Sequence, residues 1–281
     1  MALAGVGCTP AEPMTSERTA SMAPHGALRI QGVAVQEFIS RRTGFIFFNV
    51  GGIEIHRPPD GPTPGRYLLL DGKGKESGSG MITAIDRRGY FLTAAHVLGH
   101  SPSDRLHVLF DDGSGVQTAR AEVVWKGDYE NGGADFALLR VPVRLQSAFE
   151  LASRLRVSDL VIGAGPVTSP KPSGPLTLDL TLIAGSIVAV GSGSPPGIWS
   201  DVQHSAPTRR GDSGGPLVTM DGRLAGVESR ATAAAHGIGP IALYYSEVHR
   251  YAVRPATDRF IAELIEQDLV RRTGEQPKAS E

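Results

Sequence analysis

The chain has almost no cysteine, no long apolar run and almost no net charge. Cys8 is the single cysteine among 281 residues, so the sequence excludes an intramolecular disulfide and a metal site built from cysteines. No run reaches the roughly 18 apolar residues that a transmembrane helix needs. The formal net charge is -1, so the composition gives no basic footprint for nucleic-acid binding.

Glycine and proline, by contrast, are abundant. The chain holds 35 glycines and 20 prolines, together about a fifth of its residues. This usage favours many turns, as in a β-barrel or sandwich. The hydrophobic share of 41% and the length are enough to bury a substantial core in one large domain or two small ones.

The first 27 residues form a predicted tail. An apolar stretch, MALAGVGC, precedes a polar segment rich in Pro, Ser and Thr that has the composition of a disordered linker. One interpretation is the end of a bacterial lipoprotein signal, with Cys8 as the lipidated residue. The other is an ordinary disordered terminus with an incidental cysteine. The first interpretation predicts an extracytoplasmic protein with a lipid anchor at Cys8.

Short apolar runs between Gly- and Pro-containing turns fill most of the remaining chain, and we expect them to be strands. The expected strands are 33–39, 45–55, 66–70, 81–85, 90–95, 105–110, 121–125, 136–141, 160–165, 176–190, 216–220, 223–229 and 241–248. Residues 61–65 and 73–80 read as loops, and Asp111-Asp112-Gly113 reads as a hairpin turn rather than a calcium site. This spacing predicts an antiparallel all-β protein.

Only residues 256–272 have a convincing helical pattern. Phe260, Ile261, Leu264 and Ile265 recur at helical spacing, and Thr257 or Asp258 can cap the start. The segment 273–281 reads as a polar tail.

Three motifs follow one another along the chain. YFLTAAHVL puts His96 just after an expected strand, GADFALLRV puts Asp135 at the start of another, and GDSGGPLV puts Ser213 in a glycine-rich loop. A serine hydroxyl is a weak nucleophile, but a neutral imidazole can take its proton, and a buried carboxylate can orient that imidazole. The order of the motifs therefore predicts a nucleophilic serine with His96 as base and Asp135 as its orienter.

The glycines around Ser213 have a predicted role of their own. Gly211 allows the backbone to turn so that its N–H and that of Ser213 point at one spot, as in an oxyanion hole. Side chains at Gly214 and Gly215 would crowd the turn or the substrate path.

On these motifs the sequence resembles the chymotrypsin-like serine proteases of the trypsin family. The matching motifs are TAAH (93–96), DFALL (135–139), GDSGGP (211–216) and the glycine-rich strand entrance SGSGMI (77–82), and the likeness runs from about Ser77 to Val270. The resemblance implies two six-stranded antiparallel β-barrels with a C-terminal helix and a site between the barrels. It implies domains at 28–150 (with an N-terminal extension) and 151–272, a protein or peptide substrate, and no cofactor or metal.

Departures from the family pattern indicate which branch of the family this sequence resembles. No Ile-Val-Gly-Gly-like new N-terminus precedes SGSG, so activation by a cleaved N-terminus that pairs with Asp212 is not expected. The disulfide-free bacterial branch of the family is the closer likeness. The segment 28–75 is longer than the usual lead-in and has no assigned role.

For substrate specificity, the resemblance points to three positions, and two further residues offer an alternative pocket. Pro207 falls where the family has its pocket-base residue, so the Asp of trypsin-like specificity is absent. Ser229 falls where a serine supports the aspartate and begins the substrate-binding strand. Leu243 replaces a pocket-wall glycine, which favours small or apolar side chains before the cut. Thr208 and Glu228 could instead make a polar pocket.

The sequence also allows other assignments of the aspartate, the fold and the function. Asp111, Asp112 and Asp128 are rivals to Asp135, but none leads directly into an apolar strand. Gly211 to Gly215 also match the Gly-x-Ser-x-Gly elbow of α/β-hydrolases, with Asp221 and His236 in the required order, but that fold needs a helix after the serine. A trypsin-like fold can also serve as a latent or non-catalytic protein-binding module. The other histidines read as surface or packing residues.

Overall fold

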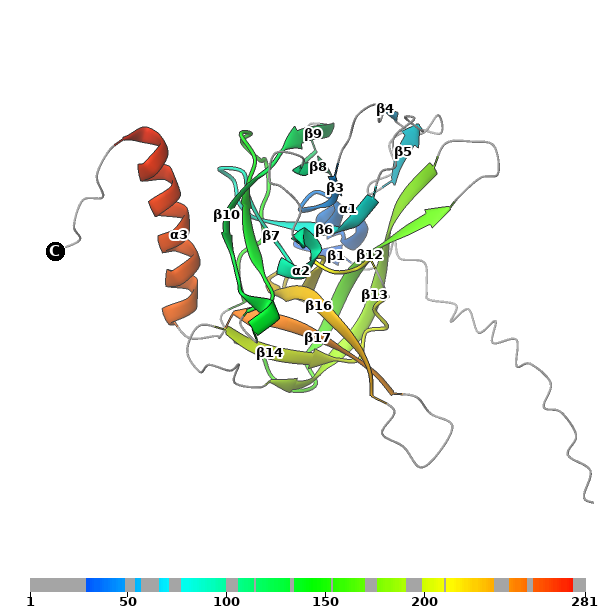
Figure 1. The fold of residues 1–281 in the computed structure, drawn as a ribbon. Coiled ribbons are helices and arrows are strands. Elements are labelled where there is room, and N and C mark those ends of the chain that lie inside the picture. The colour runs from blue at the N-terminus through cyan, green and yellow to red at the C-terminus, as the bar shows by residue number, and fades with distance from the viewer. Residues whose placement is uncertain are drawn as a thin grey trace, which may run out of the picture.

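The fold consists mainly of strands, which form two curled antiparallel sheets (Figure 1). A computed structural model describes residues 29–48, 54–56, 66–70, 77–99, 106–113, 115–131, 134–152, 154–169, 176–190, 199–209, 211–234, 243–251 and 255–274. The predicted all-β architecture of two barrel-like sheets with a C-terminal helix is confirmed.

The first sheet has seven strands in the described part of the chain. Their order is β10-β11-β7-β6-β3-β8-β9. Their bounds are β3 Thr43–Phe48, β6 Ser77–Asp86, β7 Tyr90–Thr93, β8 Leu106–Asp111, β9 Val116–Arg120, β10 Glu122–Lys126 and β11 Ala137–Arg140. β8 and β9 form the hairpin predicted at Asp111-Asp112-Gly113, where Gly113 has φ +97° and donates its N–H to Oδ1 of Asp111.

Among the described residues, the second sheet has eight strands, of which six close into a ring. The order is β12-β15-β16-β17-β14-β13-β5-β4, and an added pairing of β12 with β13 closes the ring. The bounds are β4 Glu54–His56, β5 Arg66–Leu70, β12 Leu160–Ser169, β13 Leu176–Val190, β14 Trp199–His204, β15 Pro216–Thr219, β16 Leu224–Ala234 and β17 Leu243–Tyr251. β14 and β9 were not among the expected strands.

The segment 28–75 contributes to both sheets. β3 lies between β6 and β8 in the first sheet, whereas β4 and β5 extend the second sheet from the edge of β13. β3 also corrects one expected loop, because Ser77, Gly78 and Gly80 pair with it as the first part of β6. These pairings give the long lead-in a structural role.

The prediction of a strand over 33–39 is wrong beyond its first two residues. A short hairpin of β1 (Arg29–Ile30) and β2 (Val33–Ala34) leads into helix α1 (Val35–Ser40). Val35, Phe38 and Ile39 are buried, and their spacing of three and four is that of a helix rather than of a strand. The apolar residues of this segment therefore follow the helical period, and not the alternation on which the strand prediction rests.

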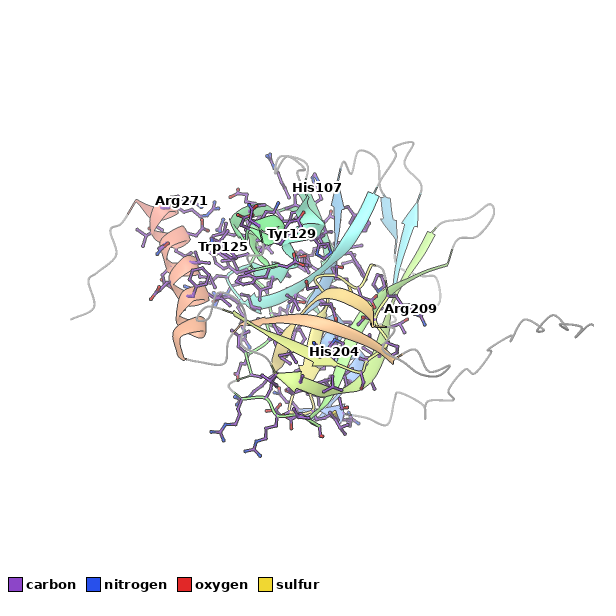
Figure 2. All side chains as sticks on the ribbon, turned by 60° about the horizontal axis from the view of Figure 1, so that its bottom comes forward. His107, Trp125, Tyr129, His204, Arg209 and Arg271 are labelled. Atoms are coloured by element: carbon purple, nitrogen blue, oxygen red, sulfur yellow. The ribbon has the colours of Figure 1, made fainter. Side chains whose placement is uncertain are left out.

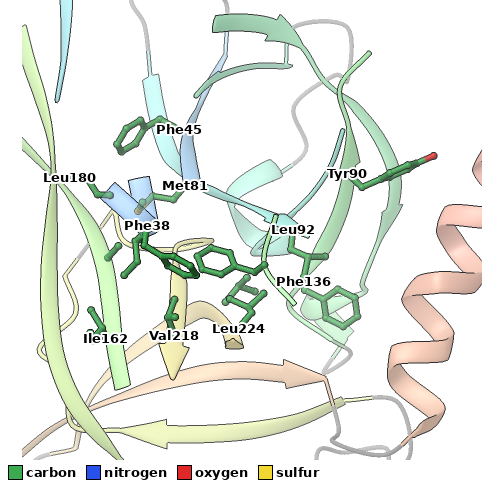
Figure 3. Close-up of a cluster of buried hydrophobic side chains, with 14 of the residues drawn as sticks. Phe38, Phe45, Met81, Tyr90, Leu92, Phe136, Ile162, Leu180, Val218 and Leu224 are labelled. Carbon is green, nitrogen blue, oxygen red and sulfur yellow. The ribbon is translucent and has the colours of Figure 1, made fainter. Parts of the chain in front are cut away.

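The largest cluster of buried side chains joins the two sheets through α1. Phe38 lies between first-sheet residues such as Met81 and second-sheet residues such as Ile162 and Val218 (Figure 3). The chain crosses here from one sheet to the other. Phe149 donates its N–H to Ala84 in β6, and a few residues later Ala152 donates to Leu224 in β16. The division into domains near residue 150 stays a prediction.

The C-terminal helix α3 (Pro255–Thr273) confirms the predicted helix and stands beside β10 of the first sheet (Figure 1). The ring of Phe260 meets Trp125 edge to face with centroids 5.4 Å apart. Asp268 is 2% exposed and accepts hydrogen bonds from the Tyr90 hydroxyl (2.9 Å), from Arg272 Nε (2.8 Å) and from Arg271. A buried carboxylate with three donors thus fixes the helix to the sheet.

Within the described ranges, no helix is long and apolar enough to span a membrane. Several predictions lie outside the described residues: the tail 1–27 with Cys8, the loop 61–65, and the polar tail from residue 275 onward.

Candidate active site

His96 lies in the four-residue helix α2 (Ala95–Leu98), which follows directly after β7. Ala94 and Ala95 are fully buried, so the small residues of the motif let this turn pack against the first sheet. The His96 side chain is 33% exposed. The backbone thus holds the imidazole at the edge of the first sheet with one side open to solvent.

Asp135 lies two residues before β11 and is 1% exposed. Its Oδ1 accepts the backbone N–H of His96 at 2.8 Å, and its Oδ2 contacts His96 Nδ1 at 2.7 Å. Oδ2 also accepts a hydrogen bond from the hydroxyl of Ser229 in β16. The two bonds to His96 orient the ring, and Ser229 joins the carboxylate to the second sheet.

Burial alone would raise the pKa of the Asp135 carboxyl. The hydrogen bonds from the His96 side chain and from Ser229 outweigh burial, and the net pKa lies below its ordinary value. Asp135 is therefore ionised at neutral pH. An ionised acceptor at Nδ1 favours the imidazole tautomer that carries its proton there, which leaves Nε2 free to accept.

Ser213 lies in the loop 205–215 between β14 and β15, which we call the serine loop. Its Oγ is 2.9 Å from His96 Nε2. The structure thus brings the three predicted side chains, from both sheets, into one hydrogen-bonded chain from Asp135 through His96 to Ser213. With the tautomer above, the hydroxyl donates to Nε2.

The serine loop is fixed against the first sheet through its backbone. Met81 donates its N–H to the Ser213 carbonyl at 2.8 Å, and the hydroxyl of Thr83 donates to the Gly214 carbonyl at 2.9 Å. Gly214 has φ +84°, and a Cβ there would lie 2.1 Å from the Met81 carbonyl oxygen. Only glycine fits at this contact, so the crowding predicted for Gly214 falls on the first sheet. A Cβ at Gly215 would lie 2.8 Å from the Asp212 carbonyl oxygen, so there the crowding falls on the turn, as predicted.

The backbone at Gly211 has the geometry that was expected of a turn. Gly211 has φ +106°, a conformation that favours glycine. Among the described residues, no acceptor is bonded to the N–H of Gly211 or of Ser213. Gly211 and Ser213 stay the predicted oxyanion donors.

A lysine and a tyrosine beside His96 were not singled out from the sequence. Tyr129, in the 3-10 turn η2 (Tyr129–Asn131), meets the His96 ring edge-on with centroids 6.2 Å apart. Lys126 Nζ donates to the Gly99 carbonyl at 2.6 Å and lies 5.5 Å from the centre of the Tyr129 ring. These side chains form one wall beside the imidazole, a contact that only tertiary structure reveals.

The four predicted specificity positions have different surroundings. Pro207 is exposed and Thr208 is half-buried, both in the serine loop. Ser229 is 4% exposed and contacts Asp135 as described above. The backbone of Leu243 begins β17 opposite Ala234, and its side chain lies outside the described part. The specificity assignments stay predictions.

Asp212, next to Ser213, is 4% exposed. Its Oδ2 accepts the backbone N–H of Arg209 at 2.6 Å. Burial raises the pKa of the Asp212 carboxyl to about 6, and the Arg209 N–H and charge oppose this rise, to which a nearby Glu228 would add only when ionised. The Asp212 carboxylate thus links two parts of the serine loop, because it bonds back to the backbone of Arg209.

The rival aspartates lie elsewhere. Asp111 caps the β8–β9 turn, and Asp128 accepts two hydrogen bonds from the Asn131 amide. In the described part of the chain, no three His, Cys, Asp or Glu side chains gather as a metal site would require. The strand β15 directly after the serine loop also excludes the α/β-hydrolase elbow, which needs a helix there.

Comparison with known proteins agrees with this geometry. Over 180 residues the chain is 32% identical to the protease Do-like 14 of Arabidopsis thaliana, a match that covers 59% of this chain and 38% of the relative. Over 200 residues it is 30% identical to a DegP-like periplasmic serine endoprotease of Bartonella henselae, covering 69% of this chain and 34% of the relative. The matched region thus spans little more than a third of these curated relatives.

A solved structure of the HtrA-type protease AlgW with a decapeptide superposes with a TM-score of 0.53. The alignment covers 87% of this chain and 76% of that chain at 19% identity, which is evidence for a shared fold. Residues 78–227, which contain His96, Asp135 and Ser213, match the trypsin-like peptidase domain. The chain belongs to the trypsin-like peptidase family.

Proposed function

We propose that this protein is a serine endopeptidase that cleaves peptide bonds through an acyl-enzyme. The observation that carries the proposal is the hydrogen-bonded chain from Asp135 through His96 to the Ser213 hydroxyl, in a member of the trypsin-like peptidase family. The ionised Asp135 favours the tautomer in which Nε2 accepts, so the Ser213 proton has a base within 2.9 Å.

The proposed reaction follows from these contacts. Ser213 Oγ attacks the carbonyl carbon of the scissile peptide while His96 Nε2 takes its proton, and the amides of Gly211 and Ser213 donate to the developing oxyanion. The imidazolium then returns the proton to the leaving amine as the C–N bond breaks. Water repeats the sequence on the acyl-enzyme and releases the acid.

The proposed substrate is a protein or peptide, outside the cytoplasm. AlgW was solved with a decapeptide, which supports a peptide substrate for this chain. The DegP-like relative is periplasmic, which supports a location outside the cytoplasm. Pro207, Thr208, Ser229 and Leu243 remain the proposed specificity positions, and Cys8 remains a candidate lipid anchor.

The alternative is a latent or non-catalytic binding module of the same fold. The intact chain of three side chains favours the enzyme, since a binding module has no need of a base 2.9 Å from its serine. Turnover of a quenched-fluorescence peptide library by purified protein separates the two. We expect cleavage that Ser213→Ala removes, and equal turnover by both proteins would contradict the proposal.

A further inference from the structure

Three buried polar side chains lie in the serine loop or in the strands next to it. They are His204 at the end of β14, Glu228 in β16 and Asp212 in the loop, and their exposed fractions are 0%, 2% and 4%. Figure 2 shows His204 among the strands of the second sheet. The proposed reaction does not use any of them.

His204 is held in one tautomer by its two contacts. Its Nδ1 is 3.2 Å from the backbone nitrogen of Ala206, an N–H that can only donate, so Nδ1 must be the unprotonated acceptor. Its Nε2 therefore carries the proton and donates to Glu228 Oε2 at 3.2 Å. The ring joins Glu228 to the first residues of the serine loop.

The backbone of Glu228 holds the other end of the same loop. Gly214 donates its N–H to the Glu228 carbonyl at 2.7 Å, and Glu228 donates its own N–H to the Gly215 carbonyl at 2.8 Å. The following residue, Ser229, reaches Asp135. Glu228 thus touches the loop before and after Ser213, once through His204 and twice through its backbone.

The strand β12 makes room for one of the two carboxylates and contacts the other. A Cβ at Gly165 would lie 2.0 Å from Asp212 Oδ1, so this glycine leaves a recess for the Asp212 carboxylate. Gly163 faces the same side of the strand, and a Cβ there would be in ordinary contact, at 3.4 Å, with Glu228 Oε1. Oε1 of Glu228 is buried and has no hydrogen-bond partner.

The surroundings of Glu228 oppose its ionisation. Burial raises the pKa of its carboxyl, and the single bond from His204 opposes that rise. The described charged groups near this recess are Asp212 and Arg209 of the serine loop, while β14 presents the neutral His204 and β12 presents glycine. A second negative charge beside Asp212 has no cation of its own.

From these contacts we propose that Glu228 and His204 are positioning residues, which fix the serine loop through one hydrogen-bonded chain, and that Glu228 does so in its uncharged form. The effect on catalysis rests on the proposed serine endopeptidase function. Ionisation of Glu228 as pH rises would place a second buried negative charge near Asp212 and loosen the loop around Ser213.

Three variants test this. Glu228→Gln mimics the uncharged acid and keeps an oxygen for His204, whereas Glu228→Leu keeps the bulk and removes that acceptor. His204→Asn keeps an acceptor near the position of Nδ1 and loses the donor to Glu228. His107→Asn, in β8 of the first sheet, is the matched histidine control.

The first readout is the rate at which a fluorophosphonate labels Ser213, together with kcat, KM and the pH profile. We expect Glu228→Leu and His204→Asn to lower the labelling rate and kcat by about tenfold or more, with KM changed far less. Glu228→Gln should keep the wild-type rate and should lack the decrease in rate that ionisation of Glu228 produces in wild type as pH rises. A glutamine variant as slow as the leucine variant would overturn the proposal.

The second readout is hydrogen exchange of residues 205–215, which needs no activity. Exchange should rise locally in Glu228→Leu and His204→Asn and match wild type in Glu228→Gln and His107→Asn. Unchanged exchange, or a rise across the whole second sheet, would contradict a positioning role. If wild-type protein is neither labelled nor active, the endopeptidase proposal fails, and the exchange result still decides the role of Glu228 and His204.

Discussion

The Ser229 hydroxyl donates to the same Asp135 oxygen that contacts His96 Nδ1. One carboxylate oxygen thus joins the histidine of the first sheet to β16 of the second. Because this bond lowers the pKa of Asp135, it keeps the carboxylate charged where His96 needs an ionised acceptor.

Removal of that hydroxyl should weaken catalysis without abolishing it. In Ser229→Ala, Asp135 keeps both bonds to His96 and loses one donor. A hydrogen bond to a charged group contributes about 1.5–3 kcal/mol, so we expect kcat/KM to fall by roughly ten- to a hundredfold. Ser229→Thr restores a hydroxyl and should recover most of the loss. If Ser229→Ala has wild-type kcat/KM, the hydroxyl has no role in orienting Asp135.

Asp135→Asn should have a larger effect. The amide can present its N–H to Nδ1 and so favours the tautomer in which Nε2 no longer accepts the Ser213 proton. The equivalent change in a well-studied protease lowers kcat by about 10⁴. Asp128→Asn is the control, since Asp128 bonds only to Asn131 among the described contacts and should leave steady-state kcat unchanged. A large loss of kcat in Asp128→Asn with none in Asp135→Asn would show that Asp135 does not orient His96.

The buried Asp212 predicts a dependence of stability on pH. Its pKa rises from 3.8 to about 6 on folding, so the native state binds more protons than the unfolded chain between these values. Native stability should therefore fall as pH rises through this window, and the deficit should remain above it. Asp212→Asn keeps an oxygen for the Arg209 N–H and removes the charge.

We expect the difference in unfolding free energy between Asp212→Asn and wild type to shift in favour of the variant between pH 4 and pH 7. The shift should be on the order of 2–3 kcal/mol. Urea denaturation at a series of pH values measures it. A constant difference between the two proteins over this range would mean that the Asp212 pKa is not raised.

The contact of Asp268 with Tyr90 and two arginines predicts that the C-terminal helix stabilises the first sheet. Asp268→Ala leaves the buried Tyr90 hydroxyl without its acceptor and Arg272 with Glu122 alone, which we expect to cost about 2 kcal/mol of unfolding free energy. Glu266→Ala, on the same helix, removes only a largely exposed ion pair with Arg88 and should change stability by about 0.5 kcal/mol or less. Equal losses in the two variants would argue against the buried contact.

The site was predictable because each of its parts carries a local signal. TAAH, DFALL and GDSGGP each combine a polar residue with small or glycine neighbours, and their order along the chain points to one chemistry. The long strand 176–190 and the C-terminal helix were equally clear, because their apolar periods are long.

What sequence alone missed depends on pairing between distant segments. His204 and Glu228 meet only because β14, β17 and β16 are adjacent in the ring, and nothing near either residue in the sequence signals a partner. β14 was missed because its sequence, WSDVQH, is too polar to read as a strand. Helix α1 was misread because six residues are too short to separate a helical period from an alternating one.

The central claim is that Ser213 is an activated nucleophile. Its most direct test is to treat purified protein with a fluorophosphonate probe and to map the modified peptide by mass spectrometry, with Ser213→Ala as control. Our account predicts a single adduct on Ser213 and no adduct on the variant. Two results would contradict it: folded wild-type protein that stays unlabelled, or equal labelling of the wild type and of Ser213→Ala.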